Sequence, residues 1–227
     1  MPDVLLHDRT TWRIIPSRYP EIGIWDRIGI AAEIDDFLAI EALTNDRIRE
    51  VQRKIARVRV EDRISGRGTT QVMSAFAYGH AGRFNDDSFG AYYAAFSEVT
   101  ALAESVHERE RFLRATKEPS IDLDMRVYTA LASGRYDDVR KRPRRDAVYD
   151  PASHLAGRIH GLKVRKSNTF DGVVYRSPRR WADGECVAAF RPRCVTNARA
   201  MKHLRYTWDG NAIGHIYAVT IVPMTPQ

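Results

Sequence analysis

The chain has little cysteine: its 227 residues contain two, Cys186 and Cys194. Neither belongs to a CxxC pair and no histidine pair stands near them, so the residue pattern argues against a metal site. We expect two buried thiols of a cytosolic protein. A single disulfide between them is the alternative that the sequence leaves open.

Long apolar runs are also absent. No stretch of about eighteen apolar residues occurs, and the first residues, MPDVLLHDRTTWR, lack the basic region followed by an apolar run that marks a secretory leader. We therefore expect a cytoplasmic protein that does not enter a membrane. Because the sequence has no internal repeat, low-complexity tract or convincing domain boundary, we expect a single domain over residues 1–227.

Positive charge is in excess, with a formal net charge of +7 and a pI near 9.6. Such a chain attracts polyanions, anionic small molecules or an acidic partner protein. The densest basic run is RKRPRR at 140–145, and a second basic stretch spans 163–166. Neither contains the interleaved aromatic residues that stack on bases. We therefore interpret them as solvated segments, and a basic nucleic-acid-binding module that uses both runs is the less favoured alternative.

The stretch 82–104, GRFNDDSFGAYYAAFSEVTALAE, organises the chain because it spaces a cation, a phenol and a carboxylate regularly. Arg83, Tyr93 and Glu104 are separated by ten and eleven residues, with the turn-forming run NDDS at 85–88 after the arginine. Brought together by that turn, these groups suit a phosphate-bearing substrate whose reaction develops positive charge.

The second half of this stretch predicts a helix. Ser97 is a suitable N-cap, and apolar residues follow at 99, 102, 103 and 106, so we expect a helix to about residue 116. Glu104 then falls at the edge of the buried stripe, half dehydrated and able to face a cleft. The following HERER at 107–111 is typical of a solvated face with intrahelical ion pairs, and a surface role is favoured for His107.

The remaining patterns mix strands and helices without a βαβ rhythm, which favours an α+β domain. We expect a short strand and an extended stretch over 12–30, helices over 33–51 and a strand over 57–64. The GRGT loop at 66–69 is interpreted as a plain turn in preference to a phosphate cradle. Alternation over 121–127 indicates a strand, with a helix over 125–132 as the alternative. A helix is expected from Asp150-Pro151 to residue 161, and strands over 171–176, 186–190 and 213–222.

Six short motifs, in order and with matching spacing, resemble the RES domain, the toxin half of bacterial RES–Xre toxin–antitoxin pairs. They are WRIIPSRYP, GRFN, YAAFSEVTALAE, DPASHLAGRIHG, GVVYRSPR and ECVAAFRP, and the resemblance as a whole spans residues 12–210. The arginine, glutamate and serine that name the family match Arg83, Glu104 and Ser177, and its tyrosine matches Tyr93. One departure is the long insert-like region 33–78, which we expect to be helical.

The resemblance implies a fold like that of ADP-ribosyltransferases, with a split β-sheet and surrounding helices around an NAD cleft. It implies hydrolysis or phosphorolysis of the nicotinamide–ribose bond of NAD, and ADP-ribosylation of a protein as the alternative. It further implies an Xre-type antitoxin partner and a homodimer or larger toxin–antitoxin complex.

The same resemblance assigns roles within that cleft. Glu104 would stabilise the positive charge on the ribose or orient the attacking water or phosphate. Arg83 would hold the pyrophosphate, while Tyr93 and Ser177 would contact the nicotinamide ribose. The further NAD-binding candidates are Arg13, Asn85 and Arg179, and no metal is expected.

Without the resemblance, plainer structural roles would be favoured for these residues. Arg83 and Glu104 would form an ion pair, Tyr93 would be a core aromatic, and Ser177 would be a turn residue.

Overall fold

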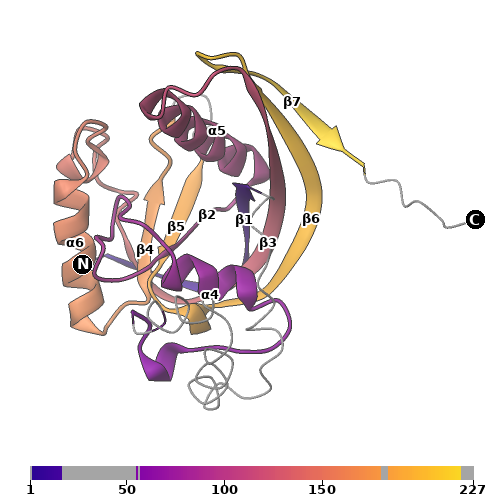
Figure 1. Cartoon of the computed structure of the whole chain (residues 1–227). Helices are drawn as coiled ribbons and strands as arrows, with labels where there is room; N and C mark the ends of the chain where they lie inside the picture. The colour runs from indigo at the N-terminus through magenta and orange to yellow at the C-terminus, as the bar shows by residue number, and fades with distance from the viewer. Residues whose placement is uncertain (1, 17–54, 56, 180–183, 221–227) are drawn as a thin grey trace, which may run out of the picture.

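The structure is a computed structural model that describes residues 2–16, 55, 57–179 and 184–220, and it confirms the α+β class (Figure 1). In these residues seven strands form one sheet. The strands are β1 (Asp3–Pro16), β2 (Tyr92–Ala95), β3 (Ile121–Asp138), β4 (Gly172–Arg176), β5 (Glu185–Ala189), β6 (Val195–Trp208) and β7 (Ile213–Val219). The helices are α4 (Thr70–Ala77), α5 (Glu98–Ala115) and α6 (Leu155–Ser167), with 3-10 turns η2 (Val60–Asp62), η3 (Ala147–Tyr149) and η4 (Pro192–Cys194).

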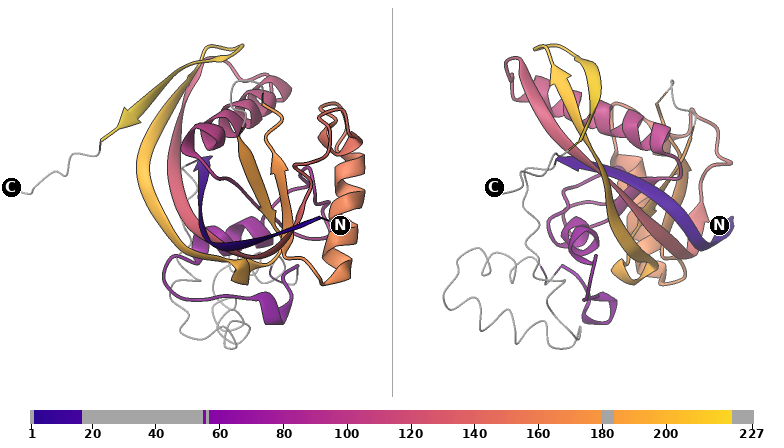
Figure 2. Two further views of the ribbon diagram at one scale, coloured as in Figure 1. Left: turned by 180° about the vertical axis from the view of Figure 1, so that it is seen from behind. Right: turned by 90° about the vertical axis from the view of Figure 1, so that its right-hand side faces the viewer.

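The sheet divides into two halves joined by narrow contacts. Its order is β1-β2-β5-β4-β3-β6-β7, and β1 pairs with β3 as well, so five of the strands close into a ring. β1 and β3 pair along nearly their whole length, yet β1 meets β2 only at Trp12 opposite Ala95. β3 and β4 run parallel and pair only at residues 136–138 of β3. The half made of β1, β3, β6 and β7 therefore diverges from the half made of β2, β5 and β4, as the split sheet requires (Figure 2).

Helix α5 lies across the gap between the two halves and packs against β1 and β2 (Figure 1). The predicted N-cap is confirmed, because the Ser97 hydroxyl accepts a hydrogen bond from the Thr100 N–H at 3.2 Å. The helix ends at Ala115 with Thr116 as its C-cap, as the periodicity predicted. Its buried residues, which include Ala101, Ala103 and Ser105, fix the face turned to the sheet.

Two hydrophobic clusters cover the two faces of the sheet, and strand alternation divides the side chains between them. Val174 packs with α4 residues such as Met73, whereas its neighbour Val173 packs with Val164 of α6. Both valines are fully buried. The short strands β4 and β5 are thereby dehydrated on both faces, which stabilises the frame that carries α5.

Several sequence predictions hold in the described residues. Residues 121–138 form one strand, so the strand interpretation of 121–127 is right and the helix alternative is wrong. β4, β5 and β7 match their predicted positions within a few residues, and the GRGT segment at 66–69 is a turn. β1 begins at Asp3, well before the predicted start, and β6 was not predicted. The helices expected over 33–51 lie outside the described residues.

The strand expected over 57–64 is wrong, and the reason is a buried carboxylate. Asp62 is fully buried in η2, with Arg165, Arg191 and Arg193 at 3.5–3.6 Å. A carboxylate excluded from water requires such cations around it. These contacts hold the segment in a turn that local alternation does not reveal.

The helix start expected at Asp150-Pro151 is also wrong, because α6 begins at Leu155. The Asp150 carboxylate instead accepts the Ala152 N–H at 2.8 Å in a local turn. No helix in the described part of the chain is long and apolar enough to cross a membrane.

Two glycines let α6 lie directly on the backbone that carries Arg83. A Cβ on Gly157 would stand 2.4 Å from the Arg83 carbonyl oxygen, and one on Gly161 would stand 1.7 Å from that of Phe84. Glycines at i and i+4 share one helix face, so both approaches occur along a single contact line. This close approach fixes the segment 82–84 against α6.

Gly161→Ala is therefore expected to destabilise the protein by about 1–3 kcal/mol, the usual effect of over-packing. Alanine is the better helix former by about 1 kcal/mol, so a helix without this contact would gain stability instead. Urea unfolding measures the change. Gly214→Ala is the matched control, since nothing lies within 4 Å of its added Cβ. An unfolding midpoint for Gly161→Ala at or above that of the control would contradict the packing account.

Candidate active site

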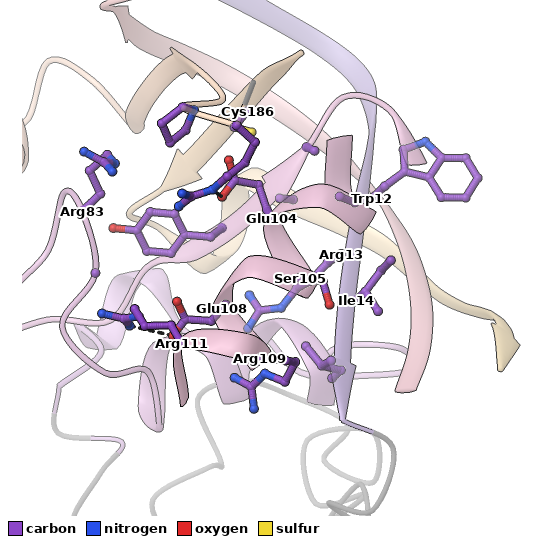
Figure 3. A pocket seen from close by; sticks show the side chains of 18 of the residues that line it. Trp12, Arg13, Ile14, Arg83, Glu104, Ser105, Glu108, Arg109, Arg111 and Cys186 are labelled. Atoms are coloured by element: carbon purple, nitrogen blue, oxygen red, sulfur yellow. Dashed lines mark hydrogen bonds and ion pairs between the residues drawn. The ribbon is translucent and has the colours of Figure 1, made fainter. Parts of the chain in front are cut away.

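A cavity of about 330 Å³ opens beneath α5, where β1 and β2 diverge (Figure 3). Its wall combines residues 12–16 of β1, residues 93–95 of β2 and the segment 80–83 with one face of α5. Tyr175 of β4, Cys186 of β5 and the loop residues Pro178 and Arg179 complete it. The volume is within the usual range of small-molecule sites.

Glu104 is the acid of this cavity. Its side chain is 28% exposed, and its two carboxylate oxygens have different partners. Oε1 accepts a hydrogen bond from the Ser177 hydroxyl at 2.6 Å, and Oε2 accepts one from Nε of Arg179 at 3.2 Å. The two hydrogen bonds fix the direction of the carboxylate. The partner of Glu104 is thus Arg179, and the alternative of an Arg83–Glu104 ion pair is wrong.

Ser177 does not line the cavity, but its hydroxyl holds the Glu104 carboxylate that does. It is fully buried directly after β4, and its hydroxyl also accepts the Arg179 N–H at 3.2 Å. Pro178 ends regular strand pairing at this point, so the chain turns and returns Arg179 toward Glu104. Ser177 therefore acts on the cavity through Glu104.

Tyr93 and Asn85 form one hydrogen-bonded unit. The Tyr93 hydroxyl donates to Asn85 Oδ1 and accepts the Phe84 N–H, both at 2.8 Å. Burial raises the pKa of Tyr93 well above its ordinary value, so the phenol stays protonated. With the hydroxyl engaged in these bonds, the ring is the part that Tyr93 presents to the cavity.

Asn85 is fully buried and serves the loop beneath the cavity. Its Nδ2 donates to the carbonyls of His80, Asp86 and Phe89, and its Oδ1 also accepts the Gly82 N–H. This amide therefore fixes both the loop 80–89 and the phenol. The cavity wall does not include it.

Arg83 lines the cavity but is anchored by backbone carbonyls. Its Nη1 donates to the carbonyl oxygens of Val148 and Asp150 at 3.0 and 3.1 Å. Burial lowers the pKa of Arg83 from its ordinary value, which still leaves the guanidinium charged at neutral pH. These contacts explain why the chain near Asp150 turns before α6 begins.

Arg13 of β1 adds a further cationic group to the wall of the cavity. Its Nη1 atom is buried without a hydrogen-bond partner, and its guanidinium lies over the Tyr92 ring at 4.9 Å. Burial lowers the pKa of Arg13. A buried and unsatisfied cationic donor on a cavity wall is a binding group for an anion.

Residues of α5 beyond Glu104 also line the cavity, where we had expected a solvated face. Glu108, Arg109 and Arg111 contribute. The predicted intrahelical pairs are nevertheless present, between Glu108 and Arg111 at 2.8 Å and between Glu110 and Arg114 at 3.1 Å. His107 lies outside the wall. Counting helical turns from Glu104 to 108 and 111 would have identified part of this set, because those positions share a face.

Two histidines of the wall, His80 and His154, were not predicted. His154 precedes α6, and burial with the nearby charge of Arg83 lowers the pKa of His154 to about 4. The imidazole is therefore neutral near pH 7. No local sequence pattern signals this position, since the cavity gains it through the packing of α6.

The cysteines match the expectation of buried free thiols. Burial raises the pKa of both Cys186 and Cys194, so neither is a thiolate at neutral pH. Among the residues that the structure describes, no group of three or more histidine, cysteine or acidic side chains is placed to hold a metal ion.

Part of the basic run 140–145 is engaged within the fold. Arg140 pairs with Asp138 at 2.8 Å and with Glu185 at 2.7 Å, and Arg144 donates to the Ser177 carbonyl at 3.3 Å. These contacts tie the run to the loop that follows β4 and reduce the charge it presents to solvent.

Taken together, the wall holds a carboxylate with both oxygens hydrogen-bonded, several guanidinium groups and an aromatic ring, a set that fits an anionic substrate whose reaction generates a cation. Comparisons with known proteins agree with the motif order. A curated relative, the uncharacterized protein y4oC of Sinorhizobium fredii (strain NBRC 101917 / NGR234), is 32% identical over 220 residues, which cover 96% of this chain and 90% of that protein. The family model described as RES domain matches residues 57–209. The chain therefore belongs to the RES domain family, whose members occur in toxin–antitoxin systems and generally act on NAD.

Proposed function

We propose that this protein is a toxin that cleaves the nicotinamide–ribose bond of NAD. The observation that supports this most directly is the Glu104 carboxylate, held by Ser177 and Arg179 on the wall of a cavity rich in arginine. An acid with both oxygens oriented can stabilise a cation at a fixed point without reorganising during the reaction.

In the proposed reaction the C–N bond between the ribose and the nicotinamide breaks. The nicotinamide leaves with the bonding electron pair as a neutral base, and the ribose becomes an oxocarbenium-like cation beside Glu104. A water or phosphate oxygen then bonds to the anomeric carbon. If water attacks, it releases one proton and the products are nicotinamide and ADP-ribose.

The other residues bind or position. Arg13, with its unsatisfied Nη1, binds a phosphate of the pyrophosphate, and the anchored Arg83 adds positive charge nearby. The Tyr93 ring packs against the substrate, while Asn85 holds that ring through its hydroxyl. Ser177 positions Glu104, and Arg179 bridges the acid and the substrate.

The partner we propose is an Xre-type antitoxin that covers the cavity and neutralises the toxin. An acidic contact surface on that protein would complement the net charge of +7. We further propose a homodimeric toxin within this complex.

Glu104→Gln is expected to lower the rate of NAD loss by at least about 100-fold, because the amide keeps the shape but loses the charge that stabilises the cation. Incubation of purified protein with NAD, with and without phosphate, measures the rate. Mass spectrometry identifies free ADP-ribose, its 1-phosphate or a modified protein. The matched control is Glu98→Gln, on the same helix and outside the cavity, where the carboxylate pairs with Lys202. Full activity in Glu104→Gln would refute the assignment.

Ser177→Ala is expected to lower kcat by about 10- to 100-fold with little change in KM, since one hydrogen bond to a charged group is lost. Ser177→Thr retains the hydroxyl and should restore much of the rate. Steady-state kinetics of nicotinamide release separates the two constants. A rise in KM alone would indicate that Ser177 binds substrate instead of positioning the acid.

Expression of the chain alone in bacteria is expected to stop growth and to lower cellular NAD, and co-expression of its antitoxin should relieve both effects. Expression of Glu104→Gln to the same level is the control for protein burden. Optical density and NAD extracted from the same cultures give the result. Normal growth with normal NAD in cells containing the folded wild-type chain would contradict the toxin proposal.

A further inference from the structure

The cavity carries more positive charge than an NAD-sized substrate requires. Of the residues that the structure describes, five arginines and two glutamates line it: Arg13, Arg83, Arg109, Arg111, Arg179, Glu104 and Glu108. The phosphates of NAD are singly charged, and its nicotinamide ring offsets one of those charges. A cationic excess is therefore left over after NAD has bound.

The excess can be located by asking which arginines have carboxylate partners. Arg179 pairs with Glu104, and Arg111 pairs with Glu108. Arg13, Arg83 and Arg109 have no ion pair with any described residue. Arg83 is held by two backbone carbonyls, and Arg13 binds the pyrophosphate in the proposed function, so Arg109 is the cation left over. Arg109 lies over the Phe112 ring at 5.5 Å, a contact that leaves its hydrogen-bond donors available.

Arg109 is displaced from the reaction centre along α5. It follows Glu104 by five residues, which corresponds to about 7.5 Å of helix rise. It stands one turn after Ser105, which also lines the cavity, and α5 packs against β1, the strand that carries Arg13. In Figure 3 Arg83 and Arg109 lie on different sides of Glu104. The cavity thus has positive charge both near the acid and away from it.

We propose that Arg109 forms a second anion subsite that binds a phosphate monoester on the adenosine ribose of the dinucleotide. The substrate class would then include NADP, the dinucleotide with a 2′-phosphate. This inference rests on the proposed function, because it names a second substrate for the same cavity.

The chemistry of the extra phosphate fits this subsite. A phosphate monoester carries a charge of about −1.5 to −2 at pH 7 and offers three strong acceptor oxygens. A guanidinium group presents donors in a planar fork that matches two of those oxygens. Because Arg109 has no carboxylate partner in the described part of the chain, a phosphate can bind to it without breaking an ion pair. Cleavage would follow the same course as for NAD, with water giving nicotinamide, 2′-phospho-ADP-ribose and one proton.

Binding of two nucleotides that lack nicotinamide tests the subsite without any turnover. Calorimetry with wild-type protein is expected to show 2′-phospho-ADP-ribose bound at least about tenfold more tightly than ADP-ribose, the typical effect of a charged hydrogen bond. Arg109→Ala should remove most of that preference. Arg199→Ala is the matched control, since Arg199 is exposed on β6 outside the cavity and its loss makes the same change in net charge.

Steady-state kinetics with NADP and with NAD as substrates gives the second measurement. The ratio of kcat/KM for NADP to that for NAD should fall about tenfold in Arg109→Ala and stay unchanged in Arg199→Ala. Equal affinity of wild-type protein for the two nucleotides, or a preference that survives in Arg109→Ala, would overturn the subsite while ADP-ribose binding still supports the proposed function. Failure to bind either nucleotide would overturn both proposals.

Discussion

The site depends on one carboxylate being held at both oxygens. Glu104 receives the Ser177 hydroxyl at Oε1 and the Arg179 guanidinium at Oε2, from a chain segment more than seventy residues away. An acid on a helix surface would otherwise rotate freely in water. The turn after β4 and the position of α5 over the divided sheet together convert an ordinary helical glutamate into an oriented, partly dehydrated one.

The same division of the sheet explains why cations gather there. β1 and β2 meet at a single register position, so the backbone leaves room between them that side chains of β1 and α5 line. Arg13 enters this room from β1 and Arg83 from the segment pinned by α6. Neither guanidinium is paired with a described carboxylate, so the charge of the cavity is available to a ligand.

The sequence predicted the local parts of this arrangement and missed the non-local ones. Ser97 as a helix cap and the helix to residue 116 follow from short-range chemistry, as does the strand before Ser177. The turn at Asp62 depends on three arginines distant in the chain, and the late start of α6 depends on Arg83 binding the Asp150 carbonyl. The turn at 85–88 indicated that Arg83, Tyr93 and Glu104 lie together, and only the motif order of the family added Ser177 to them in advance. Neither spacing nor periodicity could show that Ser177 lies behind the acid.

The closed ring of strands also determines how much of the chain must be synthesised before the cavity can form. β1 is made first, yet its long pairing partner β3 lies over a hundred residues later, and the groups that complete the cavity extend to Cys186. A nascent chain emerging from the ribosome cannot assemble Glu104, its supporting Ser177 and Arg13 of β1 until most of the protein has been translated. The cavity is thereby incomplete during most of the chain's synthesis, and a ligand can enter it only once translation is nearly finished.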